Sequence, residues 1–480
     1  MTDRPVIMWF RNDLRIQDNP ALAHACAAQL PVLAVYCLEE KDDHPLGGAS
    51  RWWLHHSLVS LQKSLSVLKI KLALRKGIAN DIISSLIKQT NASSIVWNRR
   101  YYKPDIDRDS ALKKHLEDND ISVKTFNANL IREPWEVKTG SGGPYKVFTP
   151  FWKSIRKIGP ARNNLSQLPK KIVALTKCPP SDCLEDWKLL PAKPDWADAF
   201  PDHWQAGEEN AHAFLHDFLD GPADNYDDDR NIPGMDGTSR LSPHLAFGEI
   251  SPLQIWQSTQ IRVDAGKLNA SQADKFLSQI IWRDFSCNLL YYFPNLPKAP
   301  LKEKFAHFPW QDDQAALRAW QKGKTGYPIV DAGMRQLWAT GWMHNRVRMI
   351  VASFLIKHLR IRWQEGAAWF WDTLVDADVA NNAASWQWVA GSGADASPYF
   401  RIFNPFGQGE KFDPQGDYVR QWVPELTRLP NKFIHQPWTA PQEILKTANI
   451  ELGKSYPHPI VDHKRAREKA LDAYQQIKGQ

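Results

Sequence analysis

Residues 238–243, Thr-Ser-Arg-Leu-Ser-Pro, bring three hydroxyl groups and one guanidinium together directly before a proline. Proline is favoured in the first turn of a helix, so the segment predicts a helix that begins near Pro243. Backbone N–H groups, hydroxyls and an arginine at such a point suit an anion, above all a phosphate. A capped helix without any ligand would carry the same residues, so the segment alone does not decide between the two.

A second polar segment, residues 376–382, reads Asp-Ala-Asp-Val-Ala-Asn-Asn. Two carboxylates and two carboxamides so close together can serve turns and helix caps. They can equally hydrogen-bond ribose hydroxyls and the ring edges of a flavin, with Arg346 and Arg348 as partners for the carboxylates. Tryptophans flank the segment on both sides, at Trp363, Trp369, Trp371, Trp386 and Trp388.

A third group starts at Trp282, in the sequence Trp-Arg-Asp-Phe, on a helix predicted to begin near Ser271. Asn345 and Met349 are four residues apart, so they share one face of a helix. Together with Trp282 and Trp388 they could line a pocket for a flat, apolar base pair. Each of these residues taken alone is more typical of a protein core.

The elements that position these groups come from a chain of 480 residues and 54.9 kDa, enough for two to four domains at about 100–200 residues each. Hydrophobic residues make up 43% and charged residues 24%, which excludes wholesale disorder. No stretch approaches the roughly 18 apolar residues of a membrane span, and the N-terminus has no signal-peptide layout. Five cysteines without a C-x-x-C pair argue against disulfides and a four-cysteine metal site, and they fit a reducing cytoplasm.

Charge and tryptophan content stand out from an average composition. Sixty lysines and arginines against 53 acidic residues give a net charge of +7, which suits a polyanion but also serves plain solubility. The 22 tryptophans suit either a large core or stacking and redox roles. Only the positions of the tryptophans can decide between these interpretations.

Residues 1–130 alternate short apolar runs with amphipathic segments of helical period; the runs lie at 6–10, 31–38, 71–74, 94–97 and 122–126. Buried strands joined by helices predict an α/β domain with a doubly wound parallel sheet. The turn at 11–15, Arg-Asn-Asp-Leu-Arg, lacks the glycines of a nicotinamide-binding fingerprint. Residues 131–205 are rich in proline and glycine and predict a connector, either an ordered wrap or an interdomain linker.

From residue 206 to 480 the pattern is helical almost throughout. Helices are predicted near 208–220, 250–265, 271–292, 312–322, 328–340, 343–360, 365–374 and 462–478. The chain therefore predicts an α/β domain at 1–130, a connector at 131–205 and a larger all-α domain at 206–480. Neither an internal repeat nor a coiled-coil heptad is visible, so we expect a monomer.

Several motifs together resemble the photolyase/cryptochrome family over nearly the whole chain. In chain order they are residues 9–15, 18–22, 238–243, 282–285, 326–332, 341–346, 376–382, 386–388 and 401–405. The resemblance implies a helical domain that binds FAD, active in its reduced form. It also implies light-driven repair of UV-damaged DNA, in which an electron from FAD splits a flipped-out cyclobutane pyrimidine dimer.

The same resemblance implies roles for single residues. FAD would be held by Tyr226, Thr238, Ser239, Arg240, Leu241, Ser242, Arg348, Asp376, Asp378 and Asn382, the last beside flavin N5. Electrons would pass between flavin and surface through Trp386, Trp363 and Trp310. Contacts to lesion or DNA would come from Arg230, Gln279, Trp282, Arg283, Asn345, Arg346, Met349, Trp388, Arg401 and Gln408. No metal ligand is implied.

Asn345 and Met349 match the dimer-repair pattern, whereas enzymes for the (6-4) photoproduct carry histidines in this region. Gln279 departs from the dimer-repair pattern, because many dimer photolyases have glutamate at this position. A carboxyl group can donate a proton to the reduced thymine carbonyl, while an amide can only hydrogen-bond. Glutamine keeps a donor of nearly the same length, so dimer repair remains the expectation.

Residues 48–55, Gly-Ala-Ser-Arg-Trp-Trp-Leu-His, resemble the form seen in plant cryptochromes and in related bacterial dimer photolyases. The resemblance implies a second, light-harvesting chromophore, methenyltetrahydrofolate, with tryptophan as a stacking surface and with a deazaflavin or an empty site as alternatives.

A signalling photoreceptor of the same fold is the alternative function. Photoreceptor relatives usually carry a long C-terminal extension, whereas this chain stops at Gln480 and keeps the lesion-binding set, so repair is expected. The iron–sulfur branch of the family would need four cysteines in the helical domain, where only Cys287 clearly lies.

Overall fold

The computed structural model describes residues 4–39, 44–396 and 400–478. The chain forms two compact units, each assembled from several stretches of sequence. Unit 1 consists of Met1–Asp224, Ser239–Pro294 and Val375–Asp378, and unit 2 of Asn225–Thr238, Asn295–Leu374 and Val379–Gln480. Because the units interleave along the chain, they do not test the linear boundaries expected at residues 130 and 205, which stay a prediction.

Unit 1 contains a five-stranded sheet in which every strand is parallel to its neighbours. The order is β3-β2-β1-β4-β5, with β1 at Val6–Phe10, β2 at Val32–Leu38, β3 at Leu72–Lys76, β4 at Ser94–Asn98 and β5 at Ser122–Phe126. Every residue of β1 is buried, as a central parallel strand with helices on both faces requires. The prediction of a doubly wound parallel sheet is confirmed.

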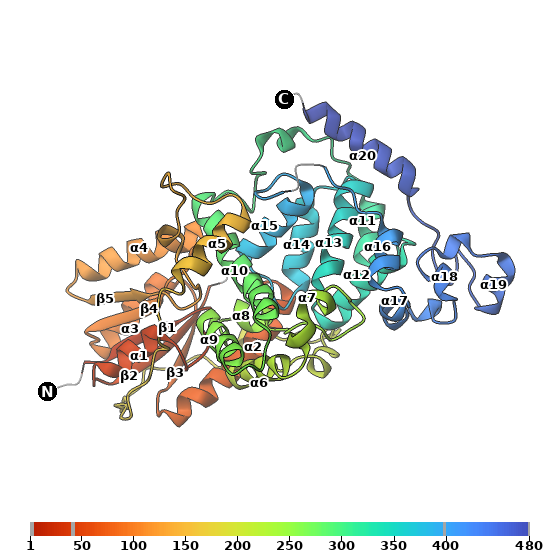
Figure 1. Ribbon diagram of the computed structural model, residues 1–480. Helices are drawn as coiled ribbons and strands as arrows, with labels where there is room; N and C mark the ends of the chain where they lie inside the picture. Colours follow the sequence, from red (N-terminus) through yellow and green to blue (C-terminus); the bar gives the residue numbers. More distant parts are fainter. Residues whose placement is uncertain (1–3, 40–43, 397–399, 479–480) are drawn as a thin grey trace. The chain divides into compact units, whose positions relative to one another are not determined.

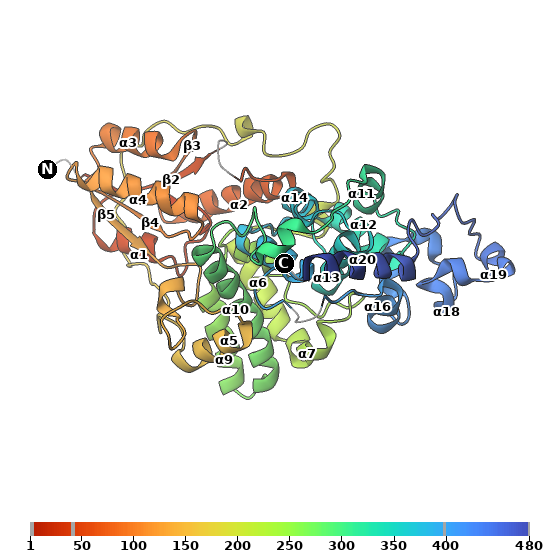
Figure 2. The same ribbon diagram turned by 90° about the horizontal axis from the view of Figure 1, so that it is seen from above.

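Four helices connect these strands: α1 (Pro20–Ala27), α2 (Gly48–Val67), α3 (Ala79–Thr90) and α4 (Lys103–Glu117). α3 and α4 lie on one face of the sheet and α1 on the other (Figure 1, Figure 2). The apolar core between the sheet and these helices includes Trp9 and Trp97, whose rings meet edge to face with centroids 5.7 Å apart. Both indoles are buried, so they serve packing.

The turn after β1, residues 11–15, binds backbone carbonyls of a segment that is distant in sequence. Arg15 is fully buried, and its guanidinium donates to the carbonyl of Gly248 at 2.8 Å. Asn12 Nδ2 donates to the carbonyl of Ala246 at 2.9 Å. The arginine-rich turn therefore docks one part of unit 1 onto another.

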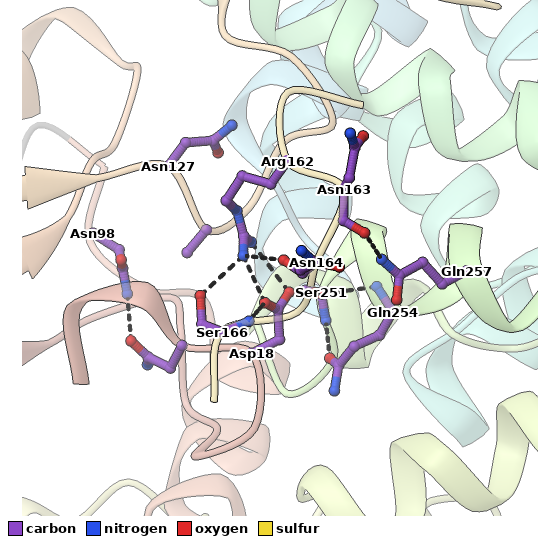
Figure 3. A network of polar contacts seen from close by, with 12 residues as sticks. Asp18, Asn98, Asn127, Arg162, Asn163, Asn164, Ser166, Ser251, Gln254 and Gln257 are labelled. Carbon is purple, nitrogen blue, oxygen red and sulfur yellow. Dashed lines mark hydrogen bonds and ion pairs between the residues drawn. The ribbon is translucent and has the colours of Figure 1, made fainter. Parts of the chain in front are cut away.

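Residues 131–205 contain one α-helix, α5 (Phe148–Ile158), which the sequence analysis did not predict. A polar network holds part of this connector in place (Figure 3). The Asp18 carboxylate accepts from Arg162 Nη1 at 2.8 Å and from Ser251 Oγ at 2.6 Å. These bonds are typical of an ordered wrap rather than a loose linker.

The remaining helices of unit 1 are α6 (Glu208–Leu219), α8 (Ser242–Ala246), α9 (Pro252–Asp264) and α10 (Ala270–Tyr292). α9 begins with a capping box in which Ser251 and Gln254 each bind the other's backbone N–H. α10 begins after Asn269, whose side chain accepts from the N–H of Ser271. The predicted helices near 208–220, 250–265 and 271–292 are confirmed.

Unit 2 is helical, and no β-strand lies among its described residues. Its α-helices are α7 (Tyr226–Asp229), α11 (Gln314–Gln321), α12 (Pro328–Thr340), α13 (Asn345–Ser353), α14 (Trp363–Thr373), α15 (Val379–Ala390), α16 (Pro405–Phe412), α17 (Asp417–Trp422), α18 (Asn431–Ile434), α19 (Gln442–Thr447) and α20 (His463–Lys478). The helix predicted at 343–360 differs, because α13 passes into a π-helical turn at Phe354–His358. Within the described ranges, no helix combines the length and apolar character needed to cross a membrane.

Gly248→Ala tests the docking of the turn at 11–15. Gly248 has φ of +68°, and an added Cβ would lie 2.0 Å from the carbonyl oxygen of Asn12. Gly266→Ala is the matched control, because Gly266 has φ of +67° with nothing within 4 Å of its Cβ position. We expect the first change to lower the free energy of unfolding by more than about 3 kcal/mol and the second by about 1 kcal/mol, measured by urea denaturation. Equal losses in the two variants would contradict the close approach.

Candidate functional site

The segment that precedes α8 in unit 1 carries Arg240 in a left-handed conformation, with φ of +51°. Its guanidinium lies 4.6 Å from the ring centroid of Trp204 and donates to the carbonyl of His203 at 3.1 Å. Leu241, the next residue, is buried. The stacking, the hydrogen bond and the buried neighbour hold the guanidinium in one place.

Ser242 and Asp376, predicted for one ligand from two separate segments, are in contact within unit 1. Ser242 Oγ donates to Asp376 Oδ2 at 2.6 Å. α8 begins at Ser242, as predicted from Pro243, but it has only five residues. A helix this short contributes little dipole, so an anion bound here would depend on guanidinium and backbone donors.

Glu249 follows α8 and is completely buried. Its Oε2 lies 2.5 Å from Nδ1 of His244 on α8, while Oε1 accepts from Trp53 Nε1 at 3.2 Å and from Ser57 Oγ. A buried carboxylate is stable only where donors surround it. α2 therefore holds α8 through this carboxylate, a role that the sequence analysis missed.

Asn382 lies on α15 in unit 2, and its Nδ2 donates to the carbonyl of Ala367 at 3.0 Å. Because the amide nitrogen donates to the backbone, Oδ1 is the atom of this side chain that can accept a hydrogen bond from a ligand. Arg348 on α13 donates through Nε to the carbonyl of Met343 at 2.7 Å. Both side chains are therefore oriented by backbone carbonyls of unit 2.

The other residues predicted to hold FAD are distributed over both units. Tyr226 and Thr238 belong to unit 2; Tyr226 is buried and lies 5.3 Å beneath the guanidinium carbon of Arg230. Ser239 and Asp378 belong to unit 1 and are half-buried. Their contacts with a cofactor stay predictions.

The three predicted relay tryptophans belong to unit 2, and the last of them is the most exposed. Trp386 and Trp363 are each 2% exposed, whereas Trp310 is half-buried. Gly366 makes room for the first indole, because a Cβ at that position would lie 2.1 Å from Cη2 of Trp386. Trp386 also meets Phe370 edge to face, with centroids 5.0 Å apart. The relay itself stays a prediction.

Trp282 on α10 stacks on Phe148 of α5, with ring centroids 3.9 Å apart and planes 10° apart. One face of the indole is therefore covered, and only the opposite face can receive a base. Gln279, one turn earlier, is half-buried. Arg283 donates to the carbonyl of Leu245 at 3.2 Å, so this guanidinium ties α10 to α8.

Three guanidinium groups gather in unit 2. Arg346 Nη2 donates to Asn231 Oδ1 at 2.5 Å, and its guanidinium carbon lies 4.3 Å from the ring centroid of Phe412. Burial, together with the nearby positive charges of Arg230 and Arg401, lowers the pKa of Arg346. Like charges brought this close attract a polyanion.

The other residues predicted to meet the lesion in unit 2 lie on three helices. Asn345 is the first residue of α13 and is exposed, and Met349 follows one turn later, half-buried. Trp388 on α15 and Gln408 on α16 are also half-buried. All four side chains are thus open enough to meet a ligand, and their roles stay predictions.

Asp284 is a second buried carboxyl group that the sequence analysis did not assign to the site. Its Oδ2 accepts from the backbone N–H of Arg132 at 3.0 Å. Burial, opposed by this hydrogen bond and by the charge of Arg283, raises the pKa of Asp284 to about 7. Shifts of this kind are common at functional sites. The sequence signal that could have pointed to Asp284 was its place in the motif at 282–285, between Trp282 and Phe285.

Asp284→Asn should change how stability depends on pH. Since the pKa is raised in the folded protein, the folded state holds a proton between about pH 4 and pH 7 that the unfolded chain has released, and the free energy of unfolding falls as pH rises through this window. In the wild type this fall amounts to roughly 4 kcal/mol, and we expect it to be absent from the variant. The variant should therefore be more stable than the wild type at pH 8.

Urea denaturation at pH 5 and pH 8 measures the change. Asp274→Asn is the control on the same helix, because Asp274 is part-exposed beside Arg156. A pH dependence that is the same in Asp284→Asn and in the wild type would show that the carboxyl titrates normally.

Comparison with known proteins gives matches over almost the whole chain. A family model described as DNA photolyase matches residues 6–170, and one described as the FAD binding domain of DNA photolyase matches residues 276–476. The chain is 52% identical over 474 residues to a deoxyribodipyrimidine photo-lyase of Agrobacterium fabrum, covering 99% of this chain and 98% of the relative.

Cryptochromes are among the relatives as well. Cryptochrome-1 of Arabidopsis thaliana is 40% identical over 484 residues, covering 98% of this chain and 70% of the relative. Among solved structures, a bacterial class III photolyase from Agrobacterium tumefaciens matches with a TM-score of 0.96 at 51% identity, covering 100% of this chain and 99% of the other.

Proposed function

The chain belongs to the photolyase/cryptochrome family, and on that basis we propose that it is a light-driven enzyme that splits cyclobutane pyrimidine dimers in DNA. The start of α13 carries the proposal, because Asn345 and Met349 lie there on the same helix as Arg346, which gathers with Arg230 and Arg401. Amide and thioether groups suit a neutral, flat lesion, and guanidinium groups suit the phosphates beside it. Relatives named deoxyribodipyrimidine photo-lyase support the same activity.

FAD is the cofactor that the matched FAD-binding domain implies, and when bound it supplies the light-driven electron donor. The donor set of this chain fits such a group. Arg240 and the backbone N–H groups around it suit a diphosphate, while the carboxylates of Asp376 and Asp378 suit ribose hydroxyls. Asn382 Oδ1 can accept from a ring N–H, because Nδ2 is already bound to the backbone. The set that we propose also includes Tyr226, Thr238, Ser239, Leu241, Ser242 and Arg348.

Trp282 and Trp388 are proposed to hold the flipped lesion by stacking. Since Phe148 covers one face of Trp282, this indole offers a single flat face to a base. Gln279 Nε2 donates to Ser278 Oγ at 2.9 Å and to the carbonyl of Lys275 at 3.4 Å, so an N–H donated to a base carbonyl would replace one of these bonds, and the amide holds no transferable proton. We propose that hydrogen bonding suffices at this position, and that Arg283 and Gln408 contact the lesion or the DNA.

A second, light-harvesting chromophore is part of the proposal, with methenyltetrahydrofolate ahead of a deazaflavin. The segment at 48–55 forms the first two turns of α2. Trp53 is fully buried and Trp52 is 5% exposed against Phe200, so these indoles offer packing rather than open stacking faces. Contacts to the chromophore would therefore come from other side chains.

A signalling photoreceptor is the second candidate function, favoured by the 40% identity to a plant cryptochrome over 98% of this chain. Such a sensor needs FAD but no lesion-binding set. Discrimination between damaged and intact DNA therefore separates the two functions. Damaged DNA as partner, a monomeric state and a cytoplasmic location remain predictions.

Trp282→Ala should weaken binding of dimer-containing duplex much more than binding of intact duplex. Stacking on an indole contributes roughly 1–3 kcal/mol per base, so we expect a loss of about 5- to 140-fold for the damaged DNA alone. Fluorescence anisotropy titrations measure both affinities. Trp256→Ala is the control, since Trp256 on α9 lies outside the proposed lesion contacts and meets Trp152 edge to face. A loss that is equal for both DNAs would rule out the stacking role.

Trp386→Phe should largely abolish photoreduction of oxidised FAD and leave repair by pre-reduced enzyme intact. The reason is that an indole is far easier to oxidise than a phenyl ring. Trp320→Phe serves as control, because Trp320 is a buried neighbour of Trp386 outside the proposed relay. Absorbance at 450 nm under blue light follows the reduction. Normal photoreduction in Trp386→Phe would exclude a relay that begins at this residue.

A further inference from the structure

We propose that His344 is a positioning residue whose imidazole caps α13 and thereby sets Asn345 and Met349 for the lesion. The inference rests on the proposed function, which assigns these two side chains to the damaged base pair. His344 precedes both in sequence and is 2% exposed, so it cannot itself meet the lesion. Its effect must pass through the first turn of the helix.

The cap is visible in the hydrogen bonds at the start of α13. His344 has φ of −56° and ψ of 135°, outside the helical range, and its Nδ1 accepts from the backbone N–H of Arg346 at 3.2 Å. This is the bond that a serine or asparagine side chain makes where it caps a helix. Because Nδ1 accepts, the imidazole proton must reside on Nε2.

The residue that carries the cap is itself fixed by α12 and α17. The backbone N–H of His344 donates to Oε1 of Gln336 at 3.2 Å, and the hydroxyl of Tyr418 donates to the same oxygen at 2.7 Å. Tyr418 is fully buried, and its own N–H donates to Asp413 Oδ1 at 3.0 Å. A single amide oxygen thus joins three helices where α13 begins.

The charges around the imidazole keep the cap in one protonation state. Arg346 and Arg348 on α13 and Arg230 at the end of α7 face it, while Asp413, directly after α16, is linked to His344 through Tyr418 and Gln336. Burial and these three positive charges lower the pKa of His344 to about 3. An imidazolium would lose its acceptor, so the cap holds throughout the physiological pH range.

Loss of the cap would move the groups that the lesion meets. Asn345 is the first helical residue, and its backbone direction is set by the capped turn. Met349 lies one turn later on the same face. A frayed first turn would displace the amide, while the Arg230 and Arg401 guanidiniums, which lie outside α13, would keep most of the attraction for phosphates. The cap should therefore affect discrimination of damage more than affinity for DNA.

Three variants of the FAD-loaded protein separate capping from filling of space. His344→Asn keeps a neutral acceptor, His344→Leu fills the site without one, and His344→Asp keeps an acceptor but adds a negative charge among the arginines. The ratio of the Kd values for intact and dimer-containing duplex is measured by anisotropy at pH 6 and pH 8, and FAD photoreduction checks that each variant is folded.

We expect His344→Asn to keep the wild-type ratio within about twofold at both pH values, and His344→Leu to lower it by about tenfold while binding of intact DNA changes little. His344→Asp should weaken both DNAs and flatten the salt dependence of binding. Equal ratios in the leucine and asparagine variants would overturn the proposal.

A second readout keeps this test separate from that of the function. Hydrogen exchange of the Arg346 backbone amide should be faster in His344→Leu than in His344→Asn, and equal rates would refute the cap itself. A wild-type protein that binds damaged and intact DNA equally would contradict the proposed function, and with it the lesion-setting role, even if exchange showed the cap.

Discussion

Glu249 is completely buried between α2 and α8. A carboxylate in that position is stable only while the hydrogen-bond donors around it stay in place. Trp53 and Ser57 supply two of these donors and His244 the third contact, so the short helix α8 cannot turn independently of α2. Two carbonyls just before Glu249, those of Ala246 and Gly248, accept hydrogen bonds from the segment at 11–15 that follows β1. The segment at 239–242, with the guanidinium that we assign to a diphosphate, leads directly into the helix that this buried carboxyl group holds.

Unit 2 uses the opposite arrangement, in which positive charges are gathered and a neutral imidazole is kept among them. Arg230 and Arg401 lie close enough to Arg346 to disfavour its charge, and such a gathering of positive groups favours a polyanion. Burial and the same electrostatic field keep His344 neutral, because a further positive charge would be repelled. One field can thus serve two purposes: it attracts phosphates, and it preserves the acceptor that caps α13.

The sheet could be predicted closely because buried parallel strands require apolar runs; β1 and β5 have the bounds expected from their runs. α5 was missed although Phe148, Phe151 and Ile155 give a helical face, since prolines and glycines on both sides suggested irregular chain. The resemblance, the α/β-plus-helical fold and the FAD-binding domain are confirmed. The role of Glu249 could not be predicted, because Trp53 and Ser57 lie in another helix and a single sequence carries no record of such contacts. The cap that we propose for His344 is local, but the bonds that fix this residue come from Gln336 and Tyr418 on other helices.

The most direct test of the proposed function is a repair assay with pre-reduced, FAD-loaded protein under blue light, with dark controls. Two oligonucleotides are supplied, one with a cyclobutane pyrimidine dimer and one with a (6-4) photoproduct, and restored bases are counted by chromatography. We expect light-dependent restoration of the dimer alone, which would also show that glutamine suffices at position 279. Failure to restore the dimer, by protein whose FAD is bound and photoreducible, would rule out dimer repair. Repair of the (6-4) lesion alone would mean that Asn345 and Met349 serve another substrate.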